Sequence, residues 1–353
     1  MSMLEPKPTP LIIAHRGACG YLPENTLAAK AVAHAQGADY WETDVLASKD
    51  GELVVLHDLY LEGLSDVDQK FPSRARDDGH FYVIDFTLAE LRTLNLSERL
   101  TSDVPGGHAT YPNRFPAGKS RFQLHTLAEE IELLQGLNHA FKREVGLYLE
   151  LKAPWFHEDA GFDLCAEALK TLKHYGYAQQ TDAVIVETFD TKALKRIKHE
   201  LMPVMQIDLR LGQLVGYNEW HTTCERDSKG QWVTVDSDWM LTPDGLEQIA
   251  TYAQGVGVAI SLLFASGDNA SSIALNKPNP QDMQPPQPPQ PAAWIEQARQ
   301  LGLVIHTYTL RADALPSFAA DVDVMHDWLI RVAKVDGVFT DFPDLMKAYL
   351  HRH

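Results

Sequence analysis

The sequence is short of cysteine, of basic residues and of long apolar runs. Its three cysteines, Cys19, Cys165 and Cys224, form no CxxC pair or zinc-site spacing, and their odd number suits no disulfide framework. Lysine and arginine number 31 against 48 aspartates and glutamates, and the net charge of −17 argues against a general nucleic-acid or anionic-membrane surface. No apolar run approaches the roughly 20 residues of a membrane-spanning helix. We therefore expect no nucleic-acid partner and no stable membrane insertion.

The sequence also lacks two nucleotide-binding loops and a signal core. No GxGxxG turn follows an apolar run and no Walker-type loop is present, which disfavours dinucleotide and nucleoside triphosphate chemistry. The N-terminal stretch MSMLEPKPTP has no hydrophobic signal core. We expect a periplasmic protein if a leader has been removed and a cytoplasmic protein otherwise, in the form of a monomer or a homodimer.

What the sequence does contain is a regular alternation of strand-like and helix-like segments. Strands are expected at Leu11–Ala14, Tyr40–Ala47, Glu52–His57, Val145–Leu151, Ala183–Glu187, Val204–Leu209, Gly257–Phe264, Val304–Leu310 and Gly337–Thr340. About eight βα units predict an α/β fold, a TIM (β/α)8 barrel, as a single domain over residues 1–353. The polar stretch 59–123 is expected to be an insertion over the carboxyl-terminal face of the barrel, and the proline-rich run 278–291 an exposed loop.

Charged residues and histidines gather where these strands end, which is where barrel enzymes place their chemistry. Residues two apart on a strand share a face, so Glu42 and Asp44 project together, as do Glu150 and Lys152. Three carboxylates that converge favour a divalent cation held by oxygen ligands, namely calcium, magnesium or manganese. The competing interpretation is a salt-bridge network of these groups with Arg16.

Two histidines complete the constellation. His15 ends the first strand and His57 follows the third strand-like run, with Asp58 next to it as a group that could orient the ring. A histidine pair on either side of a scissile bond can act as base and acid near neutral pH. A cation, an arginine, a lysine and two imidazoles suit a phosphate ester. Cys19 has no visible activating partner and is interpreted as a packing residue.

The same residues lie in motifs of a known family. In order, HRGACGYLPENT, WETDV, GELVVLHD, YLELKAPW and DGVFTDFPD resemble the motifs of glycerophosphodiester phosphodiesterases, and the likeness is strongest to the bacterial periplasmic form that serves glycerol-phosphate uptake. The resemblance covers nearly the whole chain and implies a barrel of the phospholipase-C-like phosphodiesterase type. It also implies hydrolysis of glycerophosphocholine, glycerophosphoethanolamine or glycerophosphoglycerol to sn-glycerol 3-phosphate and an alcohol.

The resemblance also implies roles for individual residues. His15 and His57 would be the acid–base pair; Glu42, Asp44 and Glu150 would hold the cation, calcium in the family members most like this chain; and Arg16 and Lys152 would contact phosphate, with Glu24 in support. Phe189 and Tyr308 are candidates for the glycerol pocket, although barrel packing is an equal alternative. Asp341 and Asp344 are expected to cap the last helix.

Two alternatives stand beside this function. One is another phospholipase-C-like phosphodiesterase, of the phosphoinositide or sphingomyelin type, which would need a more lipid-facing rim than this acidic and polar sequence offers. The other is a non-catalytic surface-binding module on the same barrel. A module of that kind should have lost part of the catalytic set, whereas the full set is present.

Overall fold

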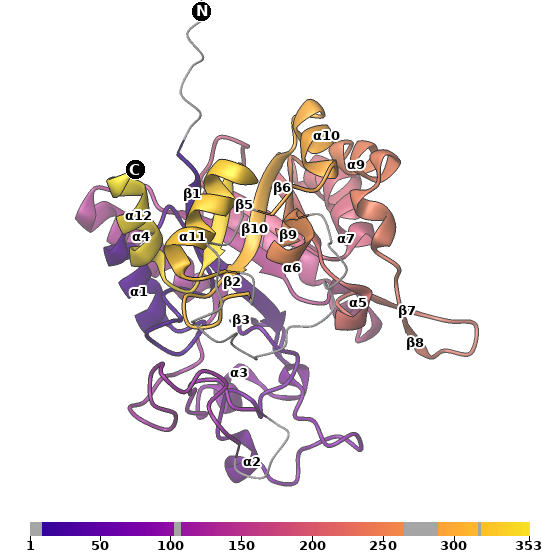
Figure 1. Ribbon diagram of the computed structural model, residues 1–353. Coiled ribbons are helices and arrows are strands. Elements are labelled where there is room, and N and C mark those ends of the chain that lie inside the picture. The colour runs from indigo at the N-terminus through magenta and orange to yellow at the C-terminus, as the bar shows by residue number, and fades with distance from the viewer. Residues whose placement is uncertain (1–8, 102–106, 265–288, 317–318) are drawn as a thin grey trace, which may run out of the picture.

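Eight parallel strands close into a barrel within the part of the chain that the computed structural model describes, residues 9–101, 107–264, 289–316 and 319–353 (Figure 1). In barrel order they are β1 (Leu11–Ala14), β2 (Tyr40–Ala47), β4 (Gly146–Leu151), β5 (Val184–Thr188), β6 (Arg210–Val215), β9 (Gly255–Ala259), β10 (Val304–Leu310) and β11 (Gly337–Thr340). Strand β1 pairs with β11 along its whole length and also with β2, which closes the ring. The predicted TIM barrel is confirmed.

Helices surround the barrel in the alternation that βα units produce (Figure 1). They are α1 (Leu27–Gln36), α4 (Leu127–Phe141), α6 (Leu164–His174), α7 (Thr191–Arg196), α9 (Pro243–Ala250), α10 (Trp294–Gln300), α11 (Val322–Asp327) and α12 (Pro343–Arg352). Thr26 caps α1 by accepting a hydrogen bond from the Ala29 N–H, and Thr126 with Glu129 forms the predicted capping box of α4. The main core lies between the strands and these helices, because the outward side chains of the strands are buried and apolar.

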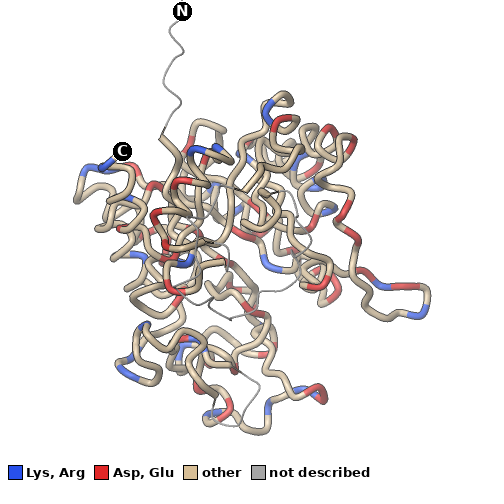
Figure 2. Tube along the Cα trace, in the orientation of Figure 1, with Lys and Arg blue, Asp and Glu red and all other residues tan. Residues whose placement is uncertain are grey.

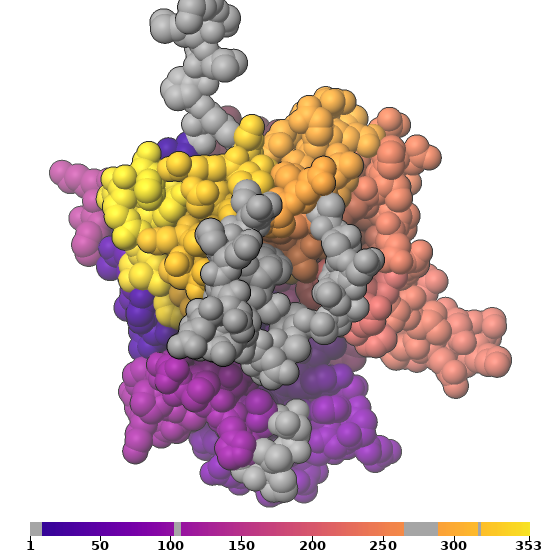
Figure 3. All heavy atoms as spheres, viewed as in Figure 1, coloured from indigo at the N-terminus to yellow at the C-terminus, as the bar shows by residue number. Residues whose placement is uncertain are grey.

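Residues 59–123, called the insertion below, pack around a second hydrophobic core, which they share with Leu46 of β2. Strand β3 (Leu53–Val55) runs antiparallel to the end of β2 and leads into the insertion, which holds the short helices α2 (Val67–Lys70) and α3 (Leu88–Leu91). Its core consists of buried apolar side chains, among them Leu61, Val67, Phe86, Leu91 and Leu94. In Figures 1 and 3 the insertion, in violet and magenta, packs against one end of the barrel.

The prediction of a strand at Val204–Leu209 is wrong. Helix α8 (Met202–Met205) occupies the start of this segment, and β6 begins only at Arg210. Met202–Met205 continues the helical run of the preceding residues, and Gln206 ends it in a left-handed conformation with φ 56°, so no strand forms at the start of this segment. The apolar residue Val204 suggested the start of a buried strand, but its side chain is 83% exposed.

The strand predicted at Gly257–Phe264 is displaced rather than absent. It corresponds to β9, which ends at Ala259, and Ile260–Leu263 forms a 3₁₀ turn. The predicted irregular stretch from Trp220 to Trp239 contains a small hairpin, β7 (Cys224–Arg226) and β8 (Trp232–Thr234), which projects from the barrel in Figure 1. The proline-rich run 278–291 lies almost entirely outside the described residues.

Acidic and basic residues alternate along much of the described chain. Figure 2 shows acidic and basic positions interspersed over the barrel and the insertion. The 48 acidic residues outnumber the 31 basic ones, and the resulting net charge of −17 is spread over many positions. Among the described helices, none combines the length and the apolar character needed to cross a bilayer.

Candidate active site

The turn after β1 places a histidine and an arginine at the carboxyl end of the barrel. His15 follows the strand, and Arg16 and Gly17 take left-handed φ values of 56° and 90°. A Cβ on Gly17 would lie 2.8 Å from the main-chain carbon of Ala29, so glycine is needed where the turn passes α1. The Arg16 N–H donates to Glu42 Oε2 over 2.5 Å, which joins this turn to β2.

Three carboxylates from two neighbouring strands converge beside the turn. Glu42 and Asp44 lie on β2, and Glu150 lies on β4, where it pairs in register with Asp44. One oxygen of each lies within 4.8 Å of the others, and all three side chains are buried. Asn25 donates to Asp44 Oδ2 over 2.8 Å and Lys152 to Glu150 Oε1 over 2.6 Å. The structure thus brings together the three predicted carboxylates and the predicted lysine.

These carboxylates repel one another in a site with little water. Burial and the charge of Asp44 raise the pKa of Glu42 well above its ordinary value, and burial raises the pKa of Glu150 to about 7. The pKa of Asp44 lies below its usual range. Burial alone would raise it, but the electrostatic interactions with His57 and Lys152 outweigh burial. Asp44 Oδ1 is buried without a hydrogen-bond partner among the described residues, and the Lys152 ammonium lies 3.6 Å from it. An all-oxygen cluster with an unsatisfied carboxylate oxygen is a donor set that fits a hard divalent cation.

Each predicted catalytic histidine is paired with an aspartate. His15 Nδ1 lies 2.7 Å from Asp341 Oδ1, and His57 Nδ1 is hydrogen-bonded to Asp58 Oδ1. An ionised carboxylate only accepts hydrogen bonds, so Nδ1 carries the hydrogen in both rings, and Nε2 has no hydrogen-bond partner within the described part of the chain. Burial and the charge of Arg16 lower the pKa of His15 to about 3 and that of His57 to about 4. Both rings are therefore neutral near pH 7.

Two arginines of the insertion reach these aspartates. Arg99 donates to Asp58 over 2.5 Å and to Glu24 over 2.7 Å, and Arg114 donates to Asp341 over 2.7 Å. Asp58, Glu24 and Asp341 all lie in turns at the carboxyl ends of strands. The described part of the insertion therefore contacts the barrel at the end that carries the histidines.

The prediction that Asp341 caps the last helix is wrong. The cap position of α12 is Phe342, and the Asp341 side chain, only 1% exposed, turns to His15 instead. A signal was present, because Asp341 directly follows β11 just as His15 follows β1. Asp344 lies in the first turn of α12, where it accepts a hydrogen bond from the Tyr21 hydroxyl.

Sequence reasoning also missed Arg99 and Arg114. They come from the irregular insertion, where no strand end or periodicity marks them. Glu24, given a supporting role, bridges Arg99 and Arg16, the latter over 2.7 Å. The carboxylate therefore links the insertion to the turn after β1.

Cys19 adds a second group of possible metal ligands. Its sulfur, His15 and an Asp341 oxygen lie within 4.8 Å of one another. A cation is disfavoured there, because the guanidinium groups of Arg114 and Arg311 already lie 2.7 and 3.2 Å from Asp341 Oδ2. Burial also raises the pKa of the Cys19 thiol well above its ordinary value.

Two aromatic residues border the carboxylates on the β5 and β10 side. The rings of Phe189 and Tyr308 meet edge to face at 6.1 Å, and Lys152 Nζ lies 6.0 Å from the centre of the Phe189 ring. The Tyr308 hydroxyl donates to the Val215 carbonyl over 2.8 Å. These positions place both rings near the site, and their part in binding glycerol stays a prediction.

Comparison with known proteins decides the family. The model of the glycerophosphoryl diester phosphodiesterase family matches residues 15–345. The chain belongs to this family. It is 46% identical to the glycerophosphodiester phosphodiesterase of Haemophilus influenzae, with 98% of this chain and 90% of that protein aligned, and 40% identical to the one of Treponema pallidum, with 96% and 91% aligned.

A solved structure agrees in fold. A phosphodiesterase of Oleispira antarctica, solved in complex with the product sn-glycerol 3-phosphate, superposes with a TM-score of 0.58 at 21% identity, covering 97% of each chain. The family model and the relatives at 46% and 40% identity identify the chain as a glycerophosphodiester phosphodiesterase, as its motifs suggested.

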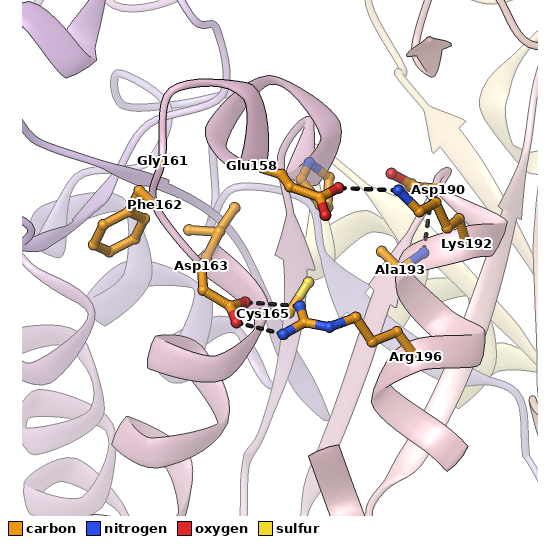
Figure 4. Close-up of a pocket in the computed structure, with 11 residues that line it drawn as sticks. Glu158, Gly161, Phe162, Asp163, Cys165, Asp190, Lys192, Ala193 and Arg196 are labelled. Carbon is orange, nitrogen blue, oxygen red and sulfur yellow. Dashed lines mark hydrogen bonds and ion pairs between the residues drawn. The ribbon is translucent and has the colours of Figure 1, made fainter. Parts of the chain in front are cut away.

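A pocket elsewhere on this phosphodiesterase does not belong to the site. About 330 Å³ in volume, it lies between α5 (Pro154–Asp159), α6 and α7 (Figure 4). Two ion pairs cross its wall: Lys192 with Glu158 at 3.2 Å, and Arg196 with Asp163, whose Nη1–Oδ1 distance is 2.9 Å. Four of its charged groups are thus already paired with one another, and a fifth, Asp190, accepts a hydrogen bond from the Ala193 N–H.

Proposed function

We propose that this phosphodiesterase is metal-dependent and uses His15 and His57 as its acid and base. It would convert glycerophosphocholine, glycerophosphoethanolamine or glycerophosphoglycerol to sn-glycerol 3-phosphate and the free alcohol. One observation carries the proposal: the cluster of Glu42, Asp44 and Glu150 lies at the same end of the barrel as two histidine–aspartate pairs.

Glu42, Asp44 and Glu150 are the residues that would hold the cation, and calcium is the ion we expect, with magnesium and manganese as alternatives. The fit rests on the all-oxygen donor set, on the unsatisfied Asp44 Oδ1 and on the raised pKa of Glu42. A bound divalent cation supplies positive charge for the phosphate oxygens as the phosphorus–oxygen bonds rearrange.

The protein's own groups would move the protons. One imidazole takes a proton from the nucleophile at its free Nε2 while the new oxygen–phosphorus bond forms. The other gives a proton to the departing alkoxide as the old phosphorus–oxygen bond breaks. The negative phosphate raises the pKa of the imidazole beside it, which lets that ring enter the reaction protonated.

The nucleophile is water or the glycerol 2-hydroxyl. In the second case a cyclic phosphate forms and water opens it. A substrate that lacks the 2-hydroxyl but still binds, as competitive inhibition would show, separates the two routes, because only direct attack by water hydrolyses it.

Arg16 and Lys152 would bind the phosphate, and Phe189 with Tyr308 would face the glycerol. Arg16 Nε lies 3.4 Å from Asp44 Oδ2 but makes no hydrogen bond among the described residues, so its N–H would be able to donate to a phosphate oxygen. If the free hydroxyls of glycerol are needed for binding, intact phospholipids, in which these hydroxyls are acylated, are poor substrates. Turnover of phosphatidylcholine would favour the lipid-cleaving alternative.

The deciding experiment measures release of glycerol 3-phosphate from glycerophosphocholine. The protein is treated with EDTA and then supplied with calcium, magnesium or manganese. We expect activity to disappear and to return with calcium, and Glu42→Gln to lose metal binding and activity together. Activity that survives EDTA would contradict the metal. Silence of a folded protein with every metal would favour a binding module.

The compartment and the assembly state complete the proposal. We propose a periplasmic enzyme where a leader directs export and a cytoplasmic one otherwise, working as a monomer or a homodimer. Cell fractionation and sedimentation test these points separately from activity.

A further inference from the structure

Arg114 joins three turns at the mouth of the barrel with one side chain. Its Nε and Nη2 donate to the two oxygens of Asp313 over 2.8 and 2.9 Å, and its Nη1 lies 3.3 Å from the Cys19 carbonyl oxygen. Nη2 also donates to Asp341 Oδ2 over 2.7 Å. The guanidinium stacks on the Tyr111 ring with its carbon 3.6 Å from the ring centre, and the side chain is only 4% exposed.

This arrangement leaves Asp341 little freedom. Its Oδ1 accepts the hydrogen bond from His15 Nδ1, while its Oδ2 accepts from Arg114 and lies 3.2 Å from Arg311 Nε. Because both oxygens are engaged on opposite sides, the plane of the carboxylate is fixed, and the plane and the tautomer of the imidazole follow from it.

The insertion repeats the scheme at the other histidine. Arg99 holds Asp58 on Oδ2, and Asp58 holds His57 through Oδ1. Two histidines, two aspartates and two arginines thus form two chains of the same order. In both chains the arginine comes from residues 59–123, whereas His15 follows the barrel strand β1 and His57 follows β3.

We infer that Arg114 is a positioning residue of the reaction: it holds Asp341 so that His15 keeps its hydrogen on Nδ1 and presents Nε2 to the substrate. The inference deepens the proposed function and rests on the role given to His15 there. Through Arg114, the insertion would help to position a catalytic group of the active site.

The charges around His15 fix the sign of the expected effect. Arg16 and Arg311 lower the pKa of His15, and Asp341 raises it. Arg114 offsets the charge of Asp341 from the far side of the carboxylate. Without Arg114 the carboxylate attracts the imidazolium more strongly, so the pKa of His15 rises. A purely structural role for Arg114 would lower stability and leave this pKa unchanged.

The test combines kinetics with nitrogen NMR of protein labelled in its histidine rings. The variants are Arg114→Gln and Arg114→Lys, and His15→Gln identifies the His15 signals. Arg76→Gln is the matched control, because Arg76 also lies in the insertion and also binds an aspartate, Asp85, through two nitrogens. Among the described residues, Arg76 contacts neither catalytic histidine and neither of their aspartates. Melting temperatures show whether each variant is folded.

For Arg114→Gln we expect kcat to fall about tenfold or more, with KM within about twofold. The His15 titration should move upward by about one pH unit, with a mixture of tautomers in place of one. Arg114→Lys keeps the charge but not the fork, so it should keep the titration near wild type and lose part of kcat. The Arg76→Gln enzyme should match the wild type.

Three results would overturn the inference. The first is an Arg114→Gln enzyme whose His15 titration, tautomer and kcat all equal those of the wild type. The second is a loss of kcat together with stability while the His15 ring is unaltered. If Arg114→Gln does not fold, an Arg114→Lys enzyme with the wild-type kcat is the third. The NMR readout needs no turnover, so it also tests the inference if the wild type proves inactive on glycerophosphodiesters.

Discussion

The imidazoles of His15 and His57 are the groups whose loss tests the chemistry most directly. We expect His15→Ala and His57→Ala each to lower the rate of glycerol 3-phosphate release about 100-fold or more, because each removes one proton transfer. The fold should persist, since both rings lie at the barrel mouth rather than in its core. His139→Ala, an exposed position on α4, is the control. Near-normal rates in both histidine variants would refute the acid–base assignment.

His157 gives a separate prediction about acid stability. Its Nε2 accepts the Ala47 N–H over 3.1 Å and its Nδ1 donates to the Ala153 carbonyl over 3.0 Å, so both nitrogens are committed in the neutral ring. Burial lowers its pKa from 6.5 to about 4. Between these values the unfolded chain binds the proton and the folded chain does not, so stability falls as the pH drops through this window and is flat above it.

Over the whole window this one residue accounts for about 3 kcal/mol of unfolding free energy. His157→Gln removes the titration and offers one acceptor and one donor in its amide. Urea unfolding from pH 7 to pH 4 should therefore show a shallower loss of stability in the variant. Parallel pH curves for the two proteins would contradict the prediction.

At the scale of elements, a buried ion pair ties two helices to β2. Lys30 of α1 lies 2.9 Å from Glu130 of α4, and it donates to Thr43 Oγ1 over 2.8 Å. All three side chains are fully buried, and Thr43 stands between the two carboxylates of β2 on the opposite face of the strand. Lys30→Met leaves the Glu130 charge without its main partner, so we expect the free energy of unfolding to fall by about 3 kcal/mol.

A second variant separates the charge from the packing. Lys30→Met combined with Glu130→Leu removes both charges, and it should recover most of the stability in urea unfolding. If the double variant is less stable than the single one, the unpaired charge is not the cause.

The residues of the site differ in whether the sequence alone could predict them. The strand ends led to Glu42, Asp44 and Glu150, because alternation along a strand and the shared edge of a parallel sheet are local rules. Asp341 was assigned to a helix cap because its contact with His15 forms only when the last strand closes the ring. Arg114 lay outside any local rule, since an irregular segment carries no period.

At the scale of the whole molecule, the net charge should affect which substrates bind well in dilute buffer. A protein of charge −17 repels an anion such as glycerophosphoglycerol and leaves the zwitterion glycerophosphocholine unaffected. Salt screens this repulsion, so we expect kcat/KM for glycerophosphoglycerol to rise about twofold or more between roughly 10 and 150 mM salt. Glycerophosphocholine, measured in parallel, should show no change. Equal salt responses would point to local charges in the site rather than the overall field.

The closure of the ring by β1 and β11 governs when the protein can first work. His15 stands at the end of the first strand and its carboxylate, Asp341, at the end of the last. During synthesis on the ribosome, Asp341 is added 326 residues after His15. A nascent chain therefore carries an incomplete site, and competence arrives only with the final strand.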